Sequence, residues 1–373
     1  MPRSDFEGRR GAAPARPPRK AGLEQIAALA GVGIATVDRV LNERGNVSSE
    51  TARKVIEAAR QLKWPRMLPV PYRRGLRLEV LLARPDTPFF QRLNTAFADA
   101  AGTLDRSVVV QRSFVDESPA ALAERILATG AQAVIAYGEE DAAVIDAITA
   151  VTVRGIPVVT LVSDIPTSPR LAYVGIDHYS AGRTAAFFVQ NMARAPGQLL
   201  VLCHNLRYRA HAQRVGGFRD RINERGGGLS IAAVLEGHDD RARSAALLSE
   251  ALGRWPDVVG IYNAGGANRG VEAALLAAGL AGKAVFVGHE LTVHTRRMLM
   301  QGTMTLTIDQ NPELQARRAI NILLHRFGYT EEAPRYDEVP FVVCGPENLT
   351  PMASETLPTH EHLETLAAGS RDG

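Results

Sequence analysis

The 373 residues, 46% of them hydrophobic, are too many for one ordinary core, so we expect two or three globular domains. The sequence has no apolar run near the ~20 residues that span a bilayer, which excludes a membrane-spanning helix. It has only two cysteines, which excludes a disulfide framework and fits a reducing cytoplasm. The charges are distributed unevenly along the chain. Residues 1–77 hold 16 of the 43 Lys and Arg residues but only 7 of the 40 Asp and Glu residues. A basic N-terminal part suited to binding nucleic acid therefore precedes an acidic remainder.

Three short helices are expected after an N-terminal arm. Residues 1–20 are rich in Arg, Pro, Gly and Ala and bury too little apolar surface to fold, so we expect a disordered basic arm. The apolar spacing predicts helices at residues 23–30, from about 34 to 42, and from Ser48 or Ser49 onward. Two helices joined by a glycine turn and crossed by a third are typical of a helix-turn-helix domain, here residues 21–64.

This helical unit reads LEQIAALAGVGIATVDRVLNERGNVSSETARKVIEAARQL and matches the pattern A-x-x-A-G-V-x-x-x-T-V-x-R-V-L-N…V-S-x-E-T. It therefore resembles the DNA-binding headpiece of the lactose-repressor (LacI/GalR) family of bacterial regulators. The resemblance implies that the second helix enters the major groove of double-stranded operator DNA. It also implies that Thr36 and Asn42 hold phosphates, whereas Ile34, Ala35 and Arg39 face base edges. Arg39 can donate two hydrogen bonds to a guanine.

Two residues of this unit depart from the family pattern. Gly33 and Asp38 stand where relatives usually have serine, so Gly33 removes a phosphate contact and a helix cap. A carboxylate close to phosphates is repelled unless it is paired. Asp38 either orients Arg39, the interpretation we favour, or accepts a hydrogen bond from a cytosine amino group.

The following segment, residues 65–77, departs further from the family pattern. Pro69 and Pro71 would disrupt the hinge helix that relatives form on operator DNA. Tyr72 falls where relatives insert a leucine into the minor groove, and Arg73 and Arg74 follow it. One hypothesis is an extended basic hinge that follows the DNA backbone or minor groove; the alternative is a plain solvated linker.

From Leu78 onward, short β-rich runs alternate with helical stretches, which predicts parallel sheets and crossover helices. The ten candidate strands are LRLEVLLA, SVVVQRSF, AVIAYG, PVVTLV, LAYVGI, QLLVLCH, LSIAAVLE, VVGIYNA, AVFVGHE and TMTLTID. This part resembles the periplasmic sugar-binding-protein fold that the same family uses as its effector domain. We expect a two-lobed α/β domain at 78–345, with lobe 1 at about 78–177 and 312–338, lobe 2 at 178–309 and 339–345, and a tail at 346–373.

A ligand cleft is expected between the carboxyl ends of the strands of the two lobes. Polar and aromatic residues recur directly after these strands and suit the hydroxyls and faces of a sugar; each one alone is more often a helix cap or a core residue. The candidates are Asp86, Phe89, Phe90, Glu139, Asp164, Arg214, Asn263, Glu290 and Gln310, with His204, His211 and His289 as further possibilities. The resemblance assigns Arg214 to the sugar.

Motifs for catalysis are weak. His289 and His294 are five residues apart, not the four of a metalloprotease helix, and no phosphate loop or nucleophile elbow is present. We therefore expect neither an enzyme nor a cofactor. The leading hypothesis is a cytoplasmic regulator that binds a near-palindromic operator as a homodimer and responds to a small sugar or polyol. The alternatives are a solute-binding protein of a sugar transporter and a sugar-acting enzyme.

Overall fold

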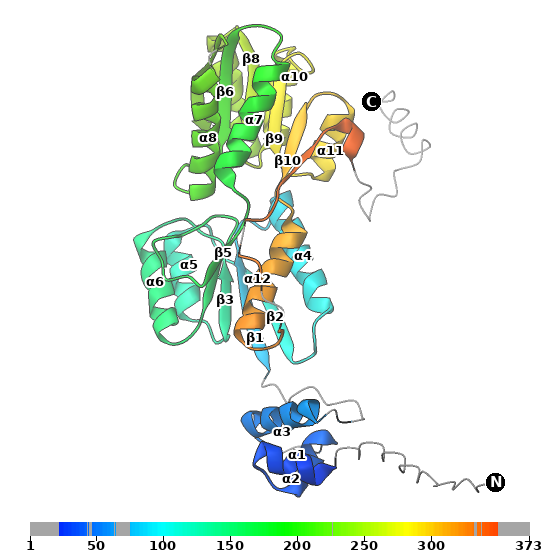
Figure 1. Ribbon diagram of the computed structural model, residues 1–373. Helices are drawn as coiled ribbons and strands as arrows, with labels where there is room; N and C mark the ends of the chain where they lie inside the picture. Colours follow the sequence, from blue (N-terminus) through cyan, green and yellow to red (C-terminus); the bar gives the residue numbers. More distant parts are fainter. Residues whose placement is uncertain are drawn as a thin grey trace, which may run out of the picture. The chain divides into compact units, whose positions relative to one another are not determined.

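The computed structural model describes residues 22–42, 44, 47–62, 64, 75–225, 227–331, 334–336 and 338–349 (Figure 1). The chain divides into two compact units, Met1–Leu76 and Arg77–Gly373. Three predictions concern residues outside the described ranges. They are the disordered arm at 1–20, the hinge residues Pro69, Pro71, Tyr72, Arg73 and Arg74, and most of the tail, from 350 onward.

The N-terminal unit contains the three helices that the sequence predicts: α1 (Leu23–Ala30), α2 (Ile34–Leu41) and α3 (Ser49–Gln61). Gly31 ends α1 in the left-handed conformation, at φ 67°, which a side chain would make unfavourable. Ser48 accepts a hydrogen bond from the backbone amide of Thr51 at 3.2 Å and so caps α3. The predicted turn and N-cap are both confirmed.

A small apolar core holds the three helices together. Val37 and Val40 of α2 are buried together with Ile26 of α1 and Val55 of α3, and Leu41 packs against them. Because these residues occupy one face of α2, the opposite face is free to contact a partner.

The second unit begins with lobe 1, a five-stranded sheet in the order β2-β1-β3-β4-β5. Its elements are β1 (Leu76–Leu82), α4 (Pro88–Gly102), β2 (Val108–Phe114), α5 (Pro119–Leu127), β3 (Ala133–Ala136), α6 (Ala142–Val153), β4 (Val158–Leu161), β5 (Ala172–Val174) and α12 (Pro312–Arg326). β3 lies between β1 and β4 and pairs with both in parallel.

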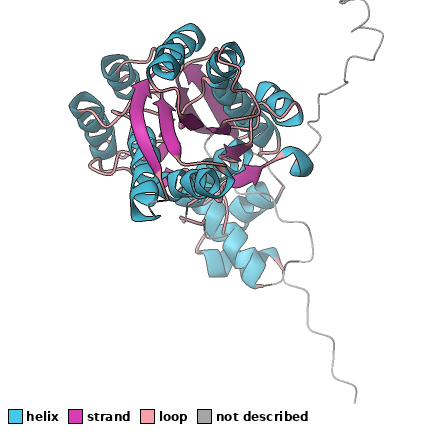
Figure 2. Cartoon of the chain, turned by 90° about the horizontal axis from the view of Figure 1, so that it is seen from above, coloured by secondary structure: helices cyan, strands magenta, loops and turns pink. Residues whose placement is uncertain are grey.

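Lobe 2 is a six-stranded sheet in the order β11-β10-β9-β8-β6-β7. Its elements are α7 (His178–Met192), β6 (Gly197–Cys203), α8 (Arg209–Arg225), β7 (Leu229–Glu236), α9 (Arg241–Arg254), β8 (Val258–Asn263), α10 (Asn268–Ala277), β9 (Val285–His289), α11 (Val293–Met300), β10 (Leu306–Asp309) and β11 (Val342–Cys344). A 3-10 helix, η1 (Pro346–Asn348), lies at the start of the predicted tail. Figure 2 shows helices on both sides of the strands.

All ten predicted strands are present in the described residues, and the predicted parallel sheets are confirmed, with one further, antiparallel strand. β11 pairs with β10 in antiparallel orientation, because the chain re-enters lobe 2 from α12 at the edge of the sheet. It has only three residues, too few to show a strand period in the sequence.

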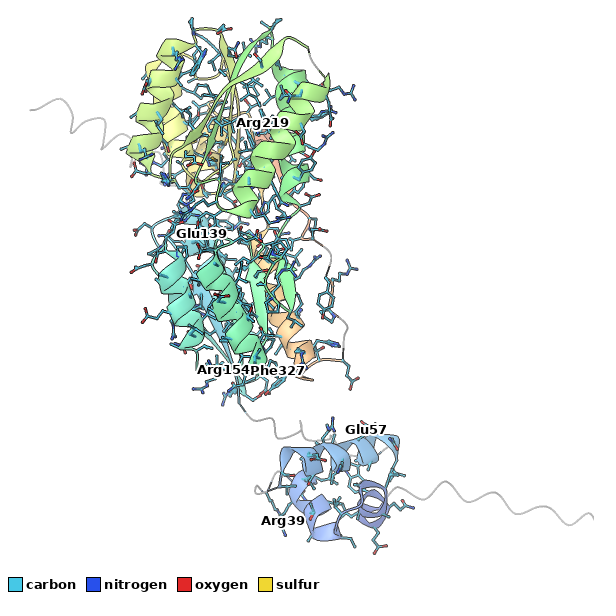
Figure 3. All side chains as sticks on the ribbon, turned by 90° about the vertical axis from the view of Figure 1, so that its left-hand side faces the viewer. Arg39, Glu57, Glu139, Arg154, Arg219 and Phe327 are labelled. Atoms are coloured by element: carbon cyan, nitrogen blue, oxygen red, sulfur yellow. The ribbon has the colours of Figure 1, made fainter. Side chains whose placement is uncertain are left out.

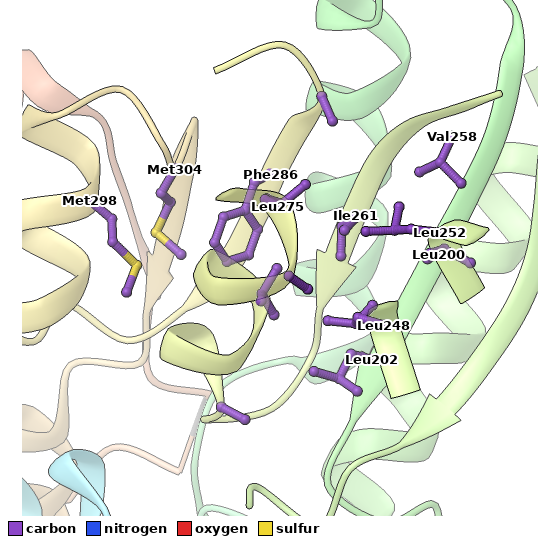
Figure 4. Close-up of a cluster of buried hydrophobic side chains, with 14 of the residues drawn as sticks. Leu200, Leu202, Leu248, Leu252, Val258, Ile261, Leu275, Phe286, Met298 and Met304 are labelled. Carbon is purple, nitrogen blue, oxygen red and sulfur yellow. The ribbon is translucent and has the colours of Figure 1, made fainter. Parts of the chain in front are cut away.

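Each lobe has its own apolar core. In lobe 2, Phe286 and Ile261 of the sheet pack with Leu275 of α10, Leu248 of α9 and Met298 of α11 (Figure 4). In lobe 1, residues of β3 and β4 pack with α5 and α6. No helix of the described ranges is long and apolar enough to cross a membrane.

Three segments connect the lobes: β5 to α7, β10 to α12, and α12 to β11. The Val339 amide donates to the Gly175 carbonyl at 2.8 Å and joins two of these segments. The strands run parallel within each sheet, β11 excepted, so the loops after their carboxyl ends gather at one edge of each lobe.

Helices α7 and α8 pack with their backbones in close approach. A Cβ at Gly217 of α8 would lie 2.1 Å from the Tyr179 carbonyl oxygen, and one at Gly182 of α7 would lie 2.0 Å from the Arg214 carbonyl oxygen. Glycine is therefore required at both positions for these helices to meet.

Gly217→Ala should destabilise the two-lobed domain by about 1–3 kcal/mol, because the new methyl group must push α7 and α8 apart. Gly216→Ala, its neighbour in the same helix with open space around the Cβ position, is the control and should be neutral or stabilising by up to about 1 kcal/mol. Urea unfolding of both variants measures the difference. Equal stability of the two variants would refute the close approach.

Candidate functional site

The outward face of α2 is the candidate DNA-binding surface. Ile34 is 47% exposed, and Ala35, Arg39 and Asn42 are also exposed, whereas Thr36 is half-buried. Figure 3 shows Arg39 at the outer surface of this domain. The five residues assigned to DNA therefore reach the surface, and Val37 and Val40 of the same helix face the core.

Asp38 does not orient Arg39, contrary to our expectation. Its carboxylate accepts a hydrogen bond from Asn42 Nδ2 at 2.7 Å and pairs with Arg44 at 3.3 Å. The reason is helical geometry: residues four apart share a face, whereas adjacent residues point in different directions. Asp38 therefore holds the Asn42 amide, and phosphate binding by Asn42 has to compete with this contact.

A cavity of about 350 Å³ lies between the two lobes of the second unit. Six of the nine predicted ligand residues line it: Asp86, Phe89, Phe90, Arg214, Glu290 and Gln310. His211 lines it as well. The expectation that ligand residues follow the carboxyl ends of parallel strands, called the strand-end rule below, therefore selects residues from both lobes and from the segment after β10 that lie in one cavity.

Aromatic rings form the wall of the cavity on lobe 1. Phe90 at the start of α4 packs edge-on against Phe89 at 5.1 Å between ring centroids, and Tyr137 after β3 lies 4.7 Å from Phe90. The Arg84 guanidinium lies over the Phe90 ring at 5.0 Å from its centroid. Such a wall offers ring faces to the C–H groups of a ligand.

Arg214 of α8 is the best-buried cation of the cavity, with 3% of its surface exposed. Its Nε donates to His178 Nδ1 at 3.1 Å and its Nη1 to the Ala264 carbonyl at 2.8 Å. The His178 Nε2 proton is donated to the Val162 carbonyl at 2.6 Å, which fixes the neutral tautomer; burial and then Arg214 hold the His178 pKa well below its usual value. Arg214 Nη2 has no partner among the described residues.

Three further cavity residues have unpaired polar atoms within the described part of the chain: Glu290 Oε2, Gln310 Oε1 and His211 Nδ1. Gln310 donates its amide to the other Glu290 oxygen. Burial, with the nearby Asp309 charge, raises the pKa of Glu290 to about 8, so this carboxyl is mostly protonated at neutral pH and can donate a hydrogen bond. Unpaired buried polar atoms are costly, and a hydroxyl-rich ligand would satisfy them.

Ion pairs connect the lobes beside the cavity. Arg84 of lobe 1 pairs with Asp239 of lobe 2, and Glu117 of lobe 1 accepts from His204 Nε2 at 2.9 Å and from the Tyr208 hydroxyl at 3.0 Å. Burial acts against the Asp239 charge, but Arg84 and the histidines hold its pKa at about 2. These pairs stabilise the arrangement in which the lobes touch.

Three predicted ligand residues do not line the cavity. Glu139 accepts two hydrogen bonds from Arg207, at 2.9 and 2.6 Å, and so forms another contact between the lobes (Figure 3). Asp164 pairs with Arg170 within lobe 1. Asn263 donates to Asn268 at 2.8 Å inside lobe 2. In each case the polar side chain is hydrogen-bonded or paired with another side chain of the protein instead of facing the cavity.

The other two candidate histidines also lie away from the cavity lining. His204 contacts Glu117, and His289 is buried with its Nε2 2.8 Å from the Tyr262 hydroxyl. Within the described ranges no cluster of three or more His, Cys, Asp and Glu side chains is arranged to hold a metal ion.

Several residues that line the cavity were not predicted from the sequence: Arg84, Tyr137, Asp239, Arg241, Asn268, Arg269, Thr292, His294 and Thr295. Arg84 and Tyr137 directly follow strand cores, so the rule that selected Asp86 also applies to them. Arg241, Arg269 and His294 lie in the first turns of α9, α10 and α11, and a basic residue at the start of a helix does not by itself point to a cavity.

Comparison with known families divides the chain at the same region. Residues 22–66 match the family described as bacterial regulatory proteins, lacI family, and residues 78–327 match the periplasmic binding protein domain. No curated protein matches the sequence significantly.

Solved structures with the same two-lobed fold cover about three quarters of the chain. A glucose-galactose binding protein, GanP, from Geobacillus stearothermophilus has a TM-score of 0.68 at 23% identity and covers 74% of this chain and 99% of its own. A transporter solute-binding protein from Burkholderia graminis in complex with D-arabinose has a TM-score of 0.68 at 20% identity, and the match covers 75% of this chain and 98% of its own. A transporter solute-binding protein from Actinobacillus succinogenes with bound D-allose has a TM-score of 0.66 at 22% identity, and the match covers 73% of this chain and 98% of its own.

Glu290→Gln should stabilise the protein increasingly as the pH rises from about 5 to 8.5. The unfolded chain loses the Glu290 proton near its ordinary pKa of 4.5, whereas the folded protein retains it to about 8, so the wild type loses stability across this interval. Glutamine cannot ionise, and the difference in Tm between variant and wild type should grow by several degrees. Glu250→Gln, on the exposed side of α9, should show no such trend. A constant Tm difference for Glu290→Gln would show that this carboxyl is not buried as a neutral acid.

Proposed function

Because this chain belongs to the lacI family of bacterial regulatory proteins and carries a periplasmic binding protein domain behind its DNA-binding domain, we propose that it represses genes of carbohydrate uptake or catabolism. In this proposal α2 reads a near-palindromic operator, and a small sugar or polyol in the cavity between the lobes changes operator affinity.

The observation that carries the proposal is the set of four unpaired polar atoms in one cavity: Arg214 Nη2, Glu290 Oε2, Gln310 Oε1 and His211 Nδ1. They supply donors and acceptors opposite the aromatic wall of Phe89, Phe90 and Tyr137. This combination suits a polyhydroxy ring, which has an apolar face and a polar rim. The similar structures are described as binding glucose and galactose, D-arabinose and D-allose, which supports the same ligand class.

The ion pairs between the lobes supply a means of coupling. Arg84–Asp239 and Arg207–Glu139 form only when the lobes touch, so a ligand that alters the spacing of the lobes must strengthen or break them. We infer that their exchange with ligand contacts sets the population of the two lobe arrangements.

We also propose a homodimer in the cytoplasm. One headpiece contacts too few base pairs for useful specificity, and two copies on a near-palindromic operator solve this problem. The alternative, a solute-binding protein of a sugar transporter, agrees with the two-lobed domain. It leaves the lacI-family match at residues 22–66 without a role.

Arg39→Ala should reduce the discrimination between the operator and random DNA by about 10- to 100-fold, because a bidentate contact to guanine is worth about 1–3 kcal/mol. Arg53→Ala, an exposed arginine of α3, removes the same charge and should leave the discrimination unchanged. Fluorescence anisotropy with upstream DNA and a scrambled duplex measures both ratios. If both variants keep the wild-type ratio, Arg39 does not read a base.

Arg214→Ala should abolish the response of operator binding to sugar, because the substitution removes the buried donor of the cavity. The matched control is Arg219→Ala, about 1.4 turns further along α8 at an exposed position (Figure 3), and it should respond like the wild type. The measurement is a gel shift with upstream DNA over a panel of monosaccharides and polyols. An unchanged response of Arg214→Ala would exclude the cavity as the effector site.

A further inference from the structure

Three helices of lobe 2 begin at the cavity, and each has a basic residue in its first turn. Arg241 is the first residue of α9, Arg269 the second residue of α10, and His294 the second residue of α11. All three line the cavity. None of these helices has an aspartate or glutamate in its first turn.

This placement is unfavourable for the protein alone. The N-terminus of a helix has a partial positive charge, so acidic residues are preferred there and a cation costs stability. Neither Arg241 nor Arg269 forms an ion pair within the described residues that would offset this cost. The pKa of His294 is lowered, first by partial burial and then by the nearby Arg269 and Arg297, while Glu272 acts in the opposite direction. Only α9 has an acidic residue as its N-cap, Asp240, whereas α10 and α11 have Ala267 and Thr292 there. The cations are therefore only partly compensated, as is common at binding sites.

The remaining charges of the cavity do not cancel these cations. Arg84 and Asp239 neutralise each other, and Glu290 is mostly protonated at neutral pH. Three guanidinium groups of the cavity lining are left, those of Arg214, Arg241 and Arg269, and the remaining acidic residue of the lining is Asp86. Asp240, the N-cap of α9, directly precedes Arg241 in the chain. Asp86 follows β1 in lobe 1, whereas the three arginines all belong to lobe 2.

Arg214 provides an independent sign of a ligand. It is 97% buried, lines the same cavity, and its Nη2 has no partner among the described residues although its other two nitrogens are bonded. A guanidinium held on two sides by His178 and Ala264 presents its remaining edge in a fixed direction. Such an edge suits an oxygen-rich ligand.

We propose that the cavity binds an anionic sugar compound, a sugar acid or a sugar phosphate. Its carboxylate or phosphate lies at the helix N-termini between Arg241 and Arg269, and its hydroxyls contact Arg214, Glu290 and Gln310. This inference rests on the proposed effector function and narrows it from sugars in general to charged sugars. Arg241 and Arg269 then determine the preference for charged over neutral compounds.

The first test uses the charge alone. Sodium phosphate at 10 mM should raise the Tm of the full chain by about 2–4 °C relative to sodium chloride of equal ionic strength. The shift should disappear in Arg241→Gln/Arg269→Gln. The control Arg194→Gln/Arg219→Gln removes two exposed charges of lobe 2 away from the cavity and should retain the shift. No shift in the wild type, or an equal shift in both double variants, would overturn the proposal.

The second test identifies the anion. Calorimetry of the full chain with D-hexoses, their aldonates and uronates, and their 6-phosphates should give at least tenfold tighter binding of a charged compound than of its neutral parent. This advantage should be lost in Arg241→Gln/Arg269→Gln and kept in the control. Preference for the aldonates or uronates indicates a sugar acid, and preference for the 6-phosphates a sugar phosphate. A neutral sugar that binds best, or a panel in which nothing binds, would contradict the inference.

The same panel, repeated with operator DNA, separates this inference from the proposed function. If only neutral sugars change operator affinity, the inference of a charged ligand is wrong and the proposed regulatory function stands. If a charged sugar binds and operator affinity does not change, the charged site stands and the regulatory proposal fails.

Discussion

Parallel strand pairing is the constraint on which the two-lobed domain depends. Because the strands of each sheet run the same way, β11 excepted, the residues after β1, β3, β8, β9 and β10 gather at one cavity although they are far apart in the sequence. The packing of α7 on α8 through glycine then positions Arg214. A fold with antiparallel pairing would send alternate loops to the opposite edge.

Buried charge in this domain falls into two groups. Arg84 pairs with Asp239, Glu117 accepts a hydrogen bond from His204, and these contacts connect the lobes. The polar groups of the second group, led by Arg214, remain incompletely bonded within the described residues. The first group stabilises one arrangement of the lobes, and the second makes that arrangement sensitive to what enters the cavity. Different residues therefore stabilise the contact between the lobes and make it respond to a ligand.

Local pattern in the sequence predicted the three headpiece helices and ten of the eleven described strands, because periodicity and turn residues determine them. Five of the nine predicted ligand residues reach the cavity because they follow strands, and a sixth, Arg214, was predicted from the family resemblance. Glu139 and Asp164 do not reach it, because their arginine partners, Arg207 and Arg170, are brought to them only by tertiary structure. Asp38 was misassigned to Arg39 because neighbours in sequence were given more weight than helical spacing.

In the proposed function, the cavity and the DNA-binding surface of one chain are thermodynamically coupled. The most direct measurement is calorimetric titration of the full chain with the tightest-binding compound of the sugar panel, once free and once saturated with operator DNA. Coupling predicts that the DNA changes the Kd of this compound by the same factor as the compound changes the Kd of the operator, about 5- to 150-fold for typical couplings. Identical ligand affinity with and without operator DNA would contradict the account.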